Sequence, residues 1–228
     1  MIRHIDQGLS QLNQKLLTMA GLVEQAVECA TDAWRFRNMA KIADVYSIER
    51  RVNQCHLDVD AACVQLLALQ APMAKDLRFI VSCIKINNDL ERMVDLAVNI
   101  ANNTEFYLQA PTAIHIEDLS QMSDEVRIMV REVLDAFVKT DERLARRVLS
   151  RDDRVDAYKR KIVEDCLGQM KNKPDRIEQG MNLIFIAKNL ERIGDHATNI
   201  AEDVIFSASG QDIRHAVPTP PKENDSAE

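Results

Sequence analysis

The sequence contains one twelve-residue pattern twice, at an offset of one hundred positions. Residues 90–101 read LERMVDLAVNIA and residues 190–201 read LERIGDHATNIA, with eight of the twelve positions identical. A match of this length at a fixed offset indicates an internal repeat. We therefore expect two copies of one structural unit, each about half of the 228-residue chain.

The residue usage favours helices over strands. Aromatic residues make up 4% of the chain, and glycine and proline number six each. Apolar residues recur at helical spacing almost throughout, which predicts long amphipathic helices. Prolines and turn residues divide this pattern into six predicted helices, the fifth of them capped by Thr140, at about residues 5–37, 42–69, 72–107, 116–139, 140–170 and 174–209.

Together these features predict an all-α fold of two tandem three-helix bundles. The first bundle is expected at residues 1–110 and the second at residues 111–210. The repeat favours two modest cores over one large core. A polar C-terminal tail, residues 211–228, is predicted to be disordered.

Charge and targeting signals limit the possible partners. The net charge of −7 and the isoelectric point near 5.3 argue against nucleic acid, whose phosphates call for a basic surface. No signal-peptide core is present at the N-terminus, and no window approaches the ~18–20 apolar residues of a membrane span. The five cysteines form no C-x-x-C pair, which is typical of free thiols in a reducing compartment. We expect a soluble, cytoplasmic protein without direct membrane insertion.

The repeated pattern places acidic residues along one face of a helix. In each copy a glutamate, an aspartate and an asparagine follow at i, i+4 and i+8, which gives a single polar stripe. These stripes are Glu91, Asp95 and Asn99 in the first copy, and Glu191, Asp195 and Asn199 in the second. Two carboxylates one turn apart are hard oxygen ligands for a cation, provided that another helix completes the shell.

The preceding predicted helix of each half offers such partners. Glu49 and Asn53 could face the first stripe, and Asp152 and Asp156 could face the second. Because the first set has an amide where the second has a carboxylate, we expect weaker metal binding in the first half. Acidic pairs at this spacing are also common on solvated helix faces, where a nearby arginine such as Arg92 neutralises them. Both interpretations stay open at this point.

Catalytic signals are scarce in this chain. It has no phosphate-binding glycine loop, no nucleotide fingerprint and no Glu-x-x-His pairs of the kind that di-iron oxidases use. We therefore expect no enzyme, and a metal-binding scaffold or store stays open as an alternative. Gly194, which lies mid-helix where the first copy has Val94, suggests a close helix approach in the second half.

Residues 190–195, LERIGD, resemble the signature of the PhoU family, whose members are regulators associated with the phosphate-specific ABC transporter. Further segments match the family pattern in order, and the resemblance covers residues 1–215; these segments are residues 19–24, 70–78, 133–137 and 210–215. Asn53 departs from a full carboxylate set, and Val94 departs from the glycine of the signature.

The resemblance implies two three-helix bundles in a cytoplasmic homodimer. It implies a signalling adaptor that represses the phosphate-starvation response and restrains phosphate uptake. Its implied partners are the ATPase subunit of the phosphate ABC transporter and a phosphate sensor histidine kinase. The family also implies iron or zinc ions at the acidic stripes, held by Glu91 and Asp95 and by Glu191 and Asp195, with Asp152 and Asp156 as partners.

Overall fold

The computed structural model describes residues 4–109, 114 and 116–213 of the chain, and within these residues it contains helices and no strand. The first half consists of α1 (His4–Arg35), α2 (Met39–Gln70) and α3 (Ala74–Gln109). The second half consists of α4 (Glu117–Lys139), α5 (Glu142–Leu149), α6 (Asp152–Asn172), the short 3₁₀ helix η1 (Pro174–Arg176) and α7 (Ile177–Ser209). The fold is all-α, as the sequence predicts.

The predicted fifth helix is broken into α5 and α6. Thr140 does not cap it, because this residue ends α4 in the left-handed conformation with φ 50°. Asp141 caps α5 instead: its carboxylate accepts hydrogen bonds from the backbone N–H groups of Arg143 and Leu144 at 2.9 and 3.0 Å. The break follows Leu149, where Ser150 donates its hydroxyl hydrogen to the carbonyl of Arg147.

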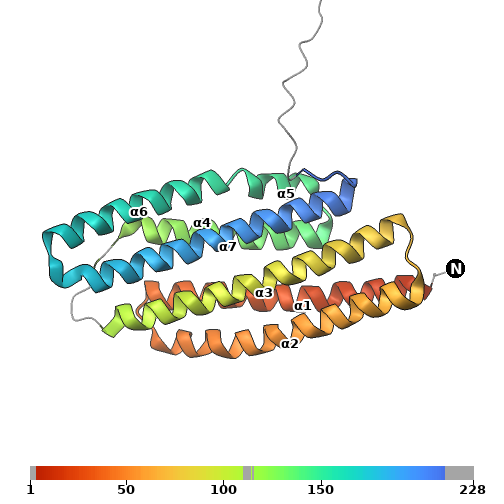
Figure 1. Ribbon diagram of the computed structural model, residues 1–228, viewed down its shortest axis with the longest axis horizontal. Helices are drawn as coiled ribbons and strands as arrows, with labels where there is room; N and C mark the ends of the chain where they lie inside the picture. Colours follow the sequence, from red (N-terminus) through yellow and green to blue (C-terminus); the bar gives the residue numbers. More distant parts are fainter. Residues whose placement is uncertain (1–3, 110–113, 115, 214–228) are drawn as a thin grey trace, which may run out of the picture.

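Two three-helix bundles lie side by side along the long axis of the molecule (Figure 1). α1, α2 and α3 form the first bundle, and α4, α7 and the broken α5–α6 pair form the second. The contact between the bundles joins equivalent helices, α3 with α7 and α1 with α4. The repeat therefore gives the molecule an approximate two-fold relation between its halves. Residues 214–228 of the predicted tail, and residues 110–113 and 115 between α3 and α4, lie outside the described residues.

The buried apolar side chains form one continuous core that spans both bundles. This corrects the expectation of two separate cores. Its physical reason is the apolar face that α3 and α7 share: Leu90, Ala97 and their counterparts Leu190 and Ala197 are fully buried. A helix that buries one side in its own bundle and another side against the second bundle joins the two cores.

Ion pairs add a polar contact between α1 and α4. The guanidinium group of Arg35 donates to both carboxylate oxygens of Asp124, at 2.6 and 2.9 Å. Arg127 on α4 donates to Asp32 and Glu28 on α1 at 3.0 and 2.6 Å.

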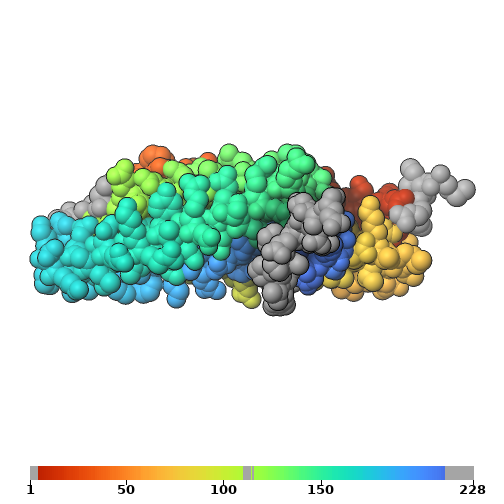
Figure 2. All heavy atoms as spheres, turned by 90° about the horizontal axis from the view of Figure 1, so that it is seen from above, coloured from red at the N-terminus to blue at the C-terminus, as the bar shows by residue number. Residues whose placement is uncertain are grey.

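The molecule is elongated, with α5 and α6 covering the face seen in Figure 2.

Four of the five cysteines are buried, and Cys55 is partly buried. All five are free thiols, as their spacing predicts. Burial raises the pKa of the Cys63 thiol to about 12, so this group is not an ionised nucleophile near neutral pH. Among the described residues, no helix is long and apolar enough to cross a membrane.

Candidate functional site

The second-half residues predicted as metal ligands come together where α6 begins. Asp152 and Asp156 lie in the first turns of α6, and Glu191 and Asp195 lie midway along α7, which packs against α6. A Cβ atom added at Gly194 would lie 3.8 Å from Oδ1 of Asp152, which shows how close this carboxylate comes to α7. We call these four residues the α6–α7 acidic cluster.

The carboxylates of the cluster act on one another. Burial raises the pKa of Asp152 to about 6, and the negative charges of Asp195, Asp156, Asp153 and Glu191 act in the same direction. Burial also raises the pKa of Asp195, and neighbouring carboxylates add to this effect. Partly buried carboxylates that repel one another favour any bound positive charge, be it a proton, an ammonium group or a cation.

A lysine supplies positive charge to this cluster. Nζ of Lys159 on α6 donates to Oε1 of Glu191 on α7 at 2.6 Å, and the Glu191 side chain is 18% exposed. The positive charge of Lys159 also opposes the rise in the pKa of Asp195. The sequence analysis missed this residue. Asp152, Asp156 and Lys159 follow one another at i, i+4 and i+7, so all three lie on the same face of α6.

The first-half candidates are paired within their own helices. On α2, Nδ2 of Asn53 donates to Oε1 of Glu49 at 2.5 Å. On α3, the guanidinium group of Arg92 lies 3.5 Å from Glu91 and 3.4 Å from Asp95. Arg92 thus partly neutralises the α3 carboxylates, as the sequence left open as an alternative, whereas the uncharged Asn53 binds Glu49 without neutralising it.

Within the described residues, no group of three or more His, Cys, Asp or Glu side chains has the geometry of a metal site. Within the cluster, the ammonium group of Lys159 pairs with Glu191, and its charge also acts on Asp195. The donor set of four carboxylates nevertheless suits a hard or borderline cation. Metal binding at either set of predicted residues therefore stays a prediction.

The polar stripe on α7 changes its role towards the C-terminus. Asp203, which continues the stripe by spacing, is 1% exposed and lies 3.4 Å from Nζ of Lys85 on α3. Nδ1 of His196 lies 2.7 Å from Oδ1 of Asp89 on α3, and Asn199 donates to the same oxygen at 3.3 Å. These residues hold the two bundles together, so the acidic cluster ends at Asp195.

Two segments of the chain match one family model, described as the PhoU domain, at residues 16–104 and 119–204. These segments correspond to the two bundles described above. The matched residues make up more than half of the chain. The chain belongs to the PhoU family.

Relatives and solved structures agree with this assignment. A phosphate-specific transport system accessory protein PhoU homolog of Zymomonas mobilis is 36% identical over 213 residues, covering 93% of this chain and 90% of the relative. The homolog of Pseudomonas aeruginosa is 35% identical over 220 residues, covering 94% and 91%. The crystal structure of PhoU from Pseudomonas aeruginosa matches with a TM-score of 0.88 at 33% identity, covering 91% of this chain and all of that chain.

The phosphate transport system regulatory protein PhoU from Streptococcus pneumoniae matches with a TM-score of 0.85 at 27% identity, covering 92% of this chain and 99% of that chain. The fold is therefore shared over nearly the full length of both structures. Two tandem bundles related by a repeat are the architecture that the sequence predicts.

Proposed function

We propose that this protein regulates phosphate transport in the cytoplasm. The observation that carries the proposal is the similarity over 93% of the chain to a relative named as an accessory protein of the phosphate-specific transport system. In this proposal the protein restrains phosphate uptake and represses the phosphate-starvation response when phosphate is ample. It links the ATPase subunit of the phosphate ABC transporter to a phosphate sensor histidine kinase, acts as a homodimer and is not an enzyme.

The chemistry of the surface supports an adaptor over a catalyst. The four carboxylates of the α6–α7 acidic cluster carry like charges, and the ammonium group of Lys159 beside them is paired with Glu191. A partly exposed acidic cluster can instead recognise a basic surface of a partner protein, where it contributes to specificity and to the rate of association.

An alkaline-phosphatase reporter in phosphate-rich medium tests this function. A strain lacking the gene should show high reporter activity, and the wild-type gene should silence it. A deletion strain whose reporter stays silent in rich medium would contradict the proposed repression. Glu191→Ala with Asp195→Ala then tests whether the α6–α7 acidic cluster takes part, and the matched control is Glu91→Ala with Asp95→Ala.

The α6–α7 acidic cluster favours cation binding as a second candidate function, with or without a role in phosphate signalling. An iron or zinc ion would be held by Asp152, Asp156, Glu191 and Asp195. Its positive charge would offset the negative charges that raise the pKa of Asp152. Lys159 would have to leave Glu191, because an ammonium group and a metal ion compete for the same oxygen. The weaker set of predicted ligands is Glu49, Asn53, Glu91 and Asp95, because Arg92 already pairs with both carboxylates on α3.

Equilibrium dialysis against Zn²⁺, with metal content measured by mass spectrometry, tests this candidate. Glu191→Ala with Asp195→Ala should lower the bound zinc, whereas Glu91→Ala with Asp95→Ala should change it little. Lys159→Met should strengthen zinc binding about tenfold or more, because it removes the competing charge. Equal losses from both acidic pairs, or no effect of Lys159→Met, would contradict a site at α6–α7.

A further inference from the structure

The outer side of α5 carries a group of arginines. Arg143, Arg146 and Arg147 follow at i, i+3 and i+4, so they lie on one side of the helix, and all three residues are exposed. Arg146 donates to Glu142 at 3.0 and 2.7 Å. Within the described part of the chain, the guanidinium groups of Arg143 and Arg147 form no ion pair or hydrogen bond. We call this surface the α5 basic face.

The acidic side chains beside this face already have partners. Asp141 caps α5 by accepting hydrogen bonds from two backbone N–H groups, and Glu142 pairs with Arg146. Residues 139–147 nevertheless carry four basic and two acidic side chains, in a chain with a net charge of −7. An open recess of about 710 Å³ lies here, lined by Lys139, Thr140, Asp141, Glu142, Arg143 and Arg146. The α5 basic face therefore offers unpaired positive charge and room for carboxylates.

The internal repeat shows that α5 does not need these arginines to fold. Asn38 caps α2 as Asp141 caps α5, each accepting from the backbone N–H two residues later, which aligns the two helices at an offset of 103. At this offset the three arginines correspond to Ala40, Ala43 and Asp44, which are all exposed on α2. The positive charge is thus particular to the second half, and packing within the bundle does not explain it.

The segments that follow the two halves differ in the same respect. Residues 110–116, which connect α3 to α4, read APTAIHI and contain no carboxylate. Residues 223–228, beyond α7, read ENDSAE and carry Glu223, Asp225 and Glu228 without a basic residue. We call residues 223–228 the acidic segment. The half that contains the basic helix is therefore also the half that is followed by acidic residues.

The described chain ends within reach of α5. α5 packs against α7, and the chain turns at Gly210, with φ 75°, where α7 ends. In Figures 1 and 2 the last described residues, in blue, lie at the same end of the molecule as α5. Residues 214–222 separate Ile213 from the acidic segment and can span at most ~33 Å. Because α5 is only ~12 Å long, the acidic segment can reach the whole α5 basic face.

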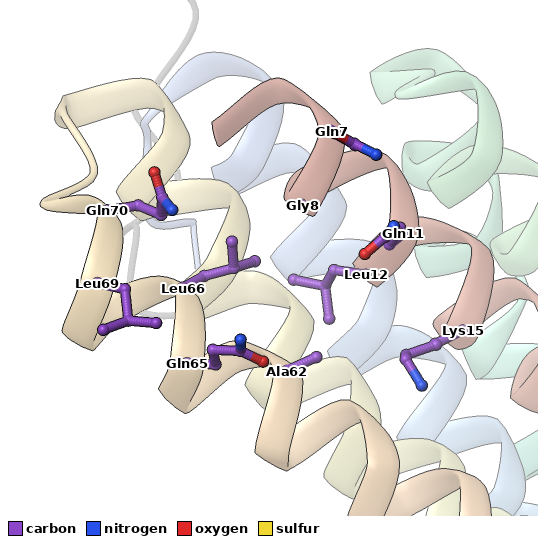
Figure 3. A pocket seen from close by; sticks show the side chains of 10 residues that line it. All are labelled: Gln7, Gly8, Gln11, Leu12, Lys15, Ala62, Gln65, Leu66, Leu69 and Gln70. Carbon is purple, nitrogen blue, oxygen red and sulfur yellow. The ribbon is translucent and has the colours of Figure 1, made fainter. Parts of the chain in front are cut away.

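A recess between α1 and α2, near the N-terminus, matches this segment less well (Figure 3). It has a volume of about 330 Å³, and Lys15 is the one charged side chain among the ten residues that line it. The other side chains are mainly glutamines and leucines, with Leu12 and Leu66 pointing toward each other. Carboxylates placed there would lose hydration without meeting enough positive charge, which costs free energy.

We propose that the acidic segment binds to the α5 basic face of the same chain. Its carboxylates pair with Arg143 and Arg147, and the segment occupies the recess at the start of α5. An acidic surface of another protein then has to displace the segment before it can bind these arginines. The proposal goes beyond the proposed function and does not depend on a role in phosphate transport.

The strength of this contact follows from its chemistry. Exposed ion pairs contribute about 0.2–1 kcal/mol each, so two or three pairs hold a separate peptide only weakly. Attachment to the same chain gives the segment an effective concentration in the millimolar range, which makes weak pairs sufficient. Salt screens exposed charges, with a Debye length of about 10 Å at 0.1 M. The segment is therefore bound at low ionic strength and released at high ionic strength.

Nuclear magnetic resonance relaxation of the ¹⁵N-labelled full-length protein tests the proposal. Backbone order parameters of residues 223–228 should exceed ~0.6 at low ionic strength and fall below ~0.6, the range of flexible segments, at high ionic strength. Arg143→Gln with Arg147→Gln should cause the same fall at low ionic strength. The matched control is Arg50→Gln with Arg51→Gln, which removes the same charge from exposed positions on α2 and should leave the segment ordered.

A second variant tests the contact from the other side. Glu223→Gln, Asp225→Asn and Glu228→Gln, combined, change no residue of the helices and should also lower the order parameters. Circular dichroism checks that the arginine variants keep their helices. Order parameters below ~0.6 in the wild type at low ionic strength would overturn the proposal. A segment that stays ordered after the substitution of Arg143 and Arg147 would overturn α5 as its binding face, and one that stays ordered without its carboxylates would overturn charge pairing.

Discussion

The two bundles repeat the same helices but treat their acidic residues differently. In the first bundle, Arg92 pairs with Glu91 and Asp95 on its own helix, and the α2 position equivalent to Lys159 is His56, whose Nε2 lies 3.5 Å from Asp60 on the same helix. In the second bundle the equivalent position is Lys159, which reaches from α6 to Glu191 on α7. The repeat therefore preserves the backbone arrangement, while single substitutions decide whether carboxylates gather between two helices.

The break between α5 and α6 is the second difference, and it positions the acidic cluster. α2 runs unbroken through Glu49, whereas α6 starts anew at the equivalent residue, Asp152. The new helix end places Asp152 and Asp153 in its first turn, where the helix dipole stabilises negative charge. Arg151 fixes this break to α4, because its guanidinium group donates to Glu125 at 2.7 Å and to Glu132 at 2.9 Å.

The largest expected effect comes from removing this anchor. Arg151→Ala should lower the free energy of unfolding by about 2–3 kcal/mol, because it leaves the carboxylate of Glu125 without its partner Arg151. The Glu125 side chain is 8% exposed, and the remaining Arg154 lies 3.5 Å away and is far more exposed. Urea denaturation followed by circular dichroism measures the change.

An exposed arginine of the first bundle is the control for this prediction. Arg51→Ala changes a side chain that is exposed on the unbroken α2, and should shift the unfolding free energy by no more than about 0.5 kcal/mol. Equal losses for the two variants would mean that Arg151 contributes no more than a surface arginine, and that the break in the helix has another cause.

A smaller change in the free energy of unfolding, of opposite sign, is expected for Asp152→Asn. Its pKa is raised from 3.8 to about 6 in the folded protein, so the folded state favours the protonated carboxyl group. The stabilisation of the folded state that comes from this raised pKa is fully present below about pH 4 and is lost as the pH rises through about 6. At pH 7, Asp152→Asn should therefore stabilise the protein by about 1–2 kcal/mol, allowing for partial exposure and for the lost interaction with the helix dipole.

The pH dependence sharpens this prediction. The advantage of Asp152→Asn over the wild type should shrink between pH 6 and pH 4, because protonation then removes the same charge from the wild-type protein. Thermal unfolding at both pH values measures it. Asp153→Asn, at an exposed position in the same turn, is the control and should show a much smaller change. A constant advantage at all pH values would rule out charge repulsion as its origin.

The sequence predicted the helices well because their signal is local. Five of the six helices were predicted close to their observed ends. The signals were the internal repeat, the apolar spacing and the two prolines Pro72 and Pro174. The break at residues 150–151 was missed because the sequence around it still has helical spacing. Ser150 followed by Asp152 and Asp153 is a local sign of a new helix end, but what holds the break is the contact of Arg151 with two glutamates on α4.

For the candidate site, spacing predicted which residues share a face but not what they meet. The predicted ligands Asp152, Asp156, Glu191 and Asp195 do lie on neighbouring helices, since consecutive helices of one bundle pack together. The burial of Asp203 against Lys85 depends on how α3 crosses α7, which helix periodicity does not specify. The pairing of Lys159 with Glu191 likewise depends on the distance between two helices.

The smallest expected effect concerns Gly194, which stands where the first bundle has the buried Val94. The sequence suggested that glycine is needed there for a close helix approach. The structure corrects this, because an added Cβ atom would meet Met129 and Val155 at 3.7 Å, an ordinary contact distance. Gly194→Ala should therefore stabilise the protein by about 0.5–1 kcal/mol, since alanine is the better helix former.

Gly180 on the same helix provides the comparison. A Cβ atom at Gly180 would lie 2.8 Å from Cγ and Sδ of Met170, so that the methionine side chain would have to move. Urea denaturation should show a gain for Gly194→Ala and a smaller gain, or a loss, for Gly180→Ala. A loss at Gly194 would mean that the acidic cluster needs the open space beside Asp152, and that the second bundle gives up helix stability at this point to hold its carboxylates together.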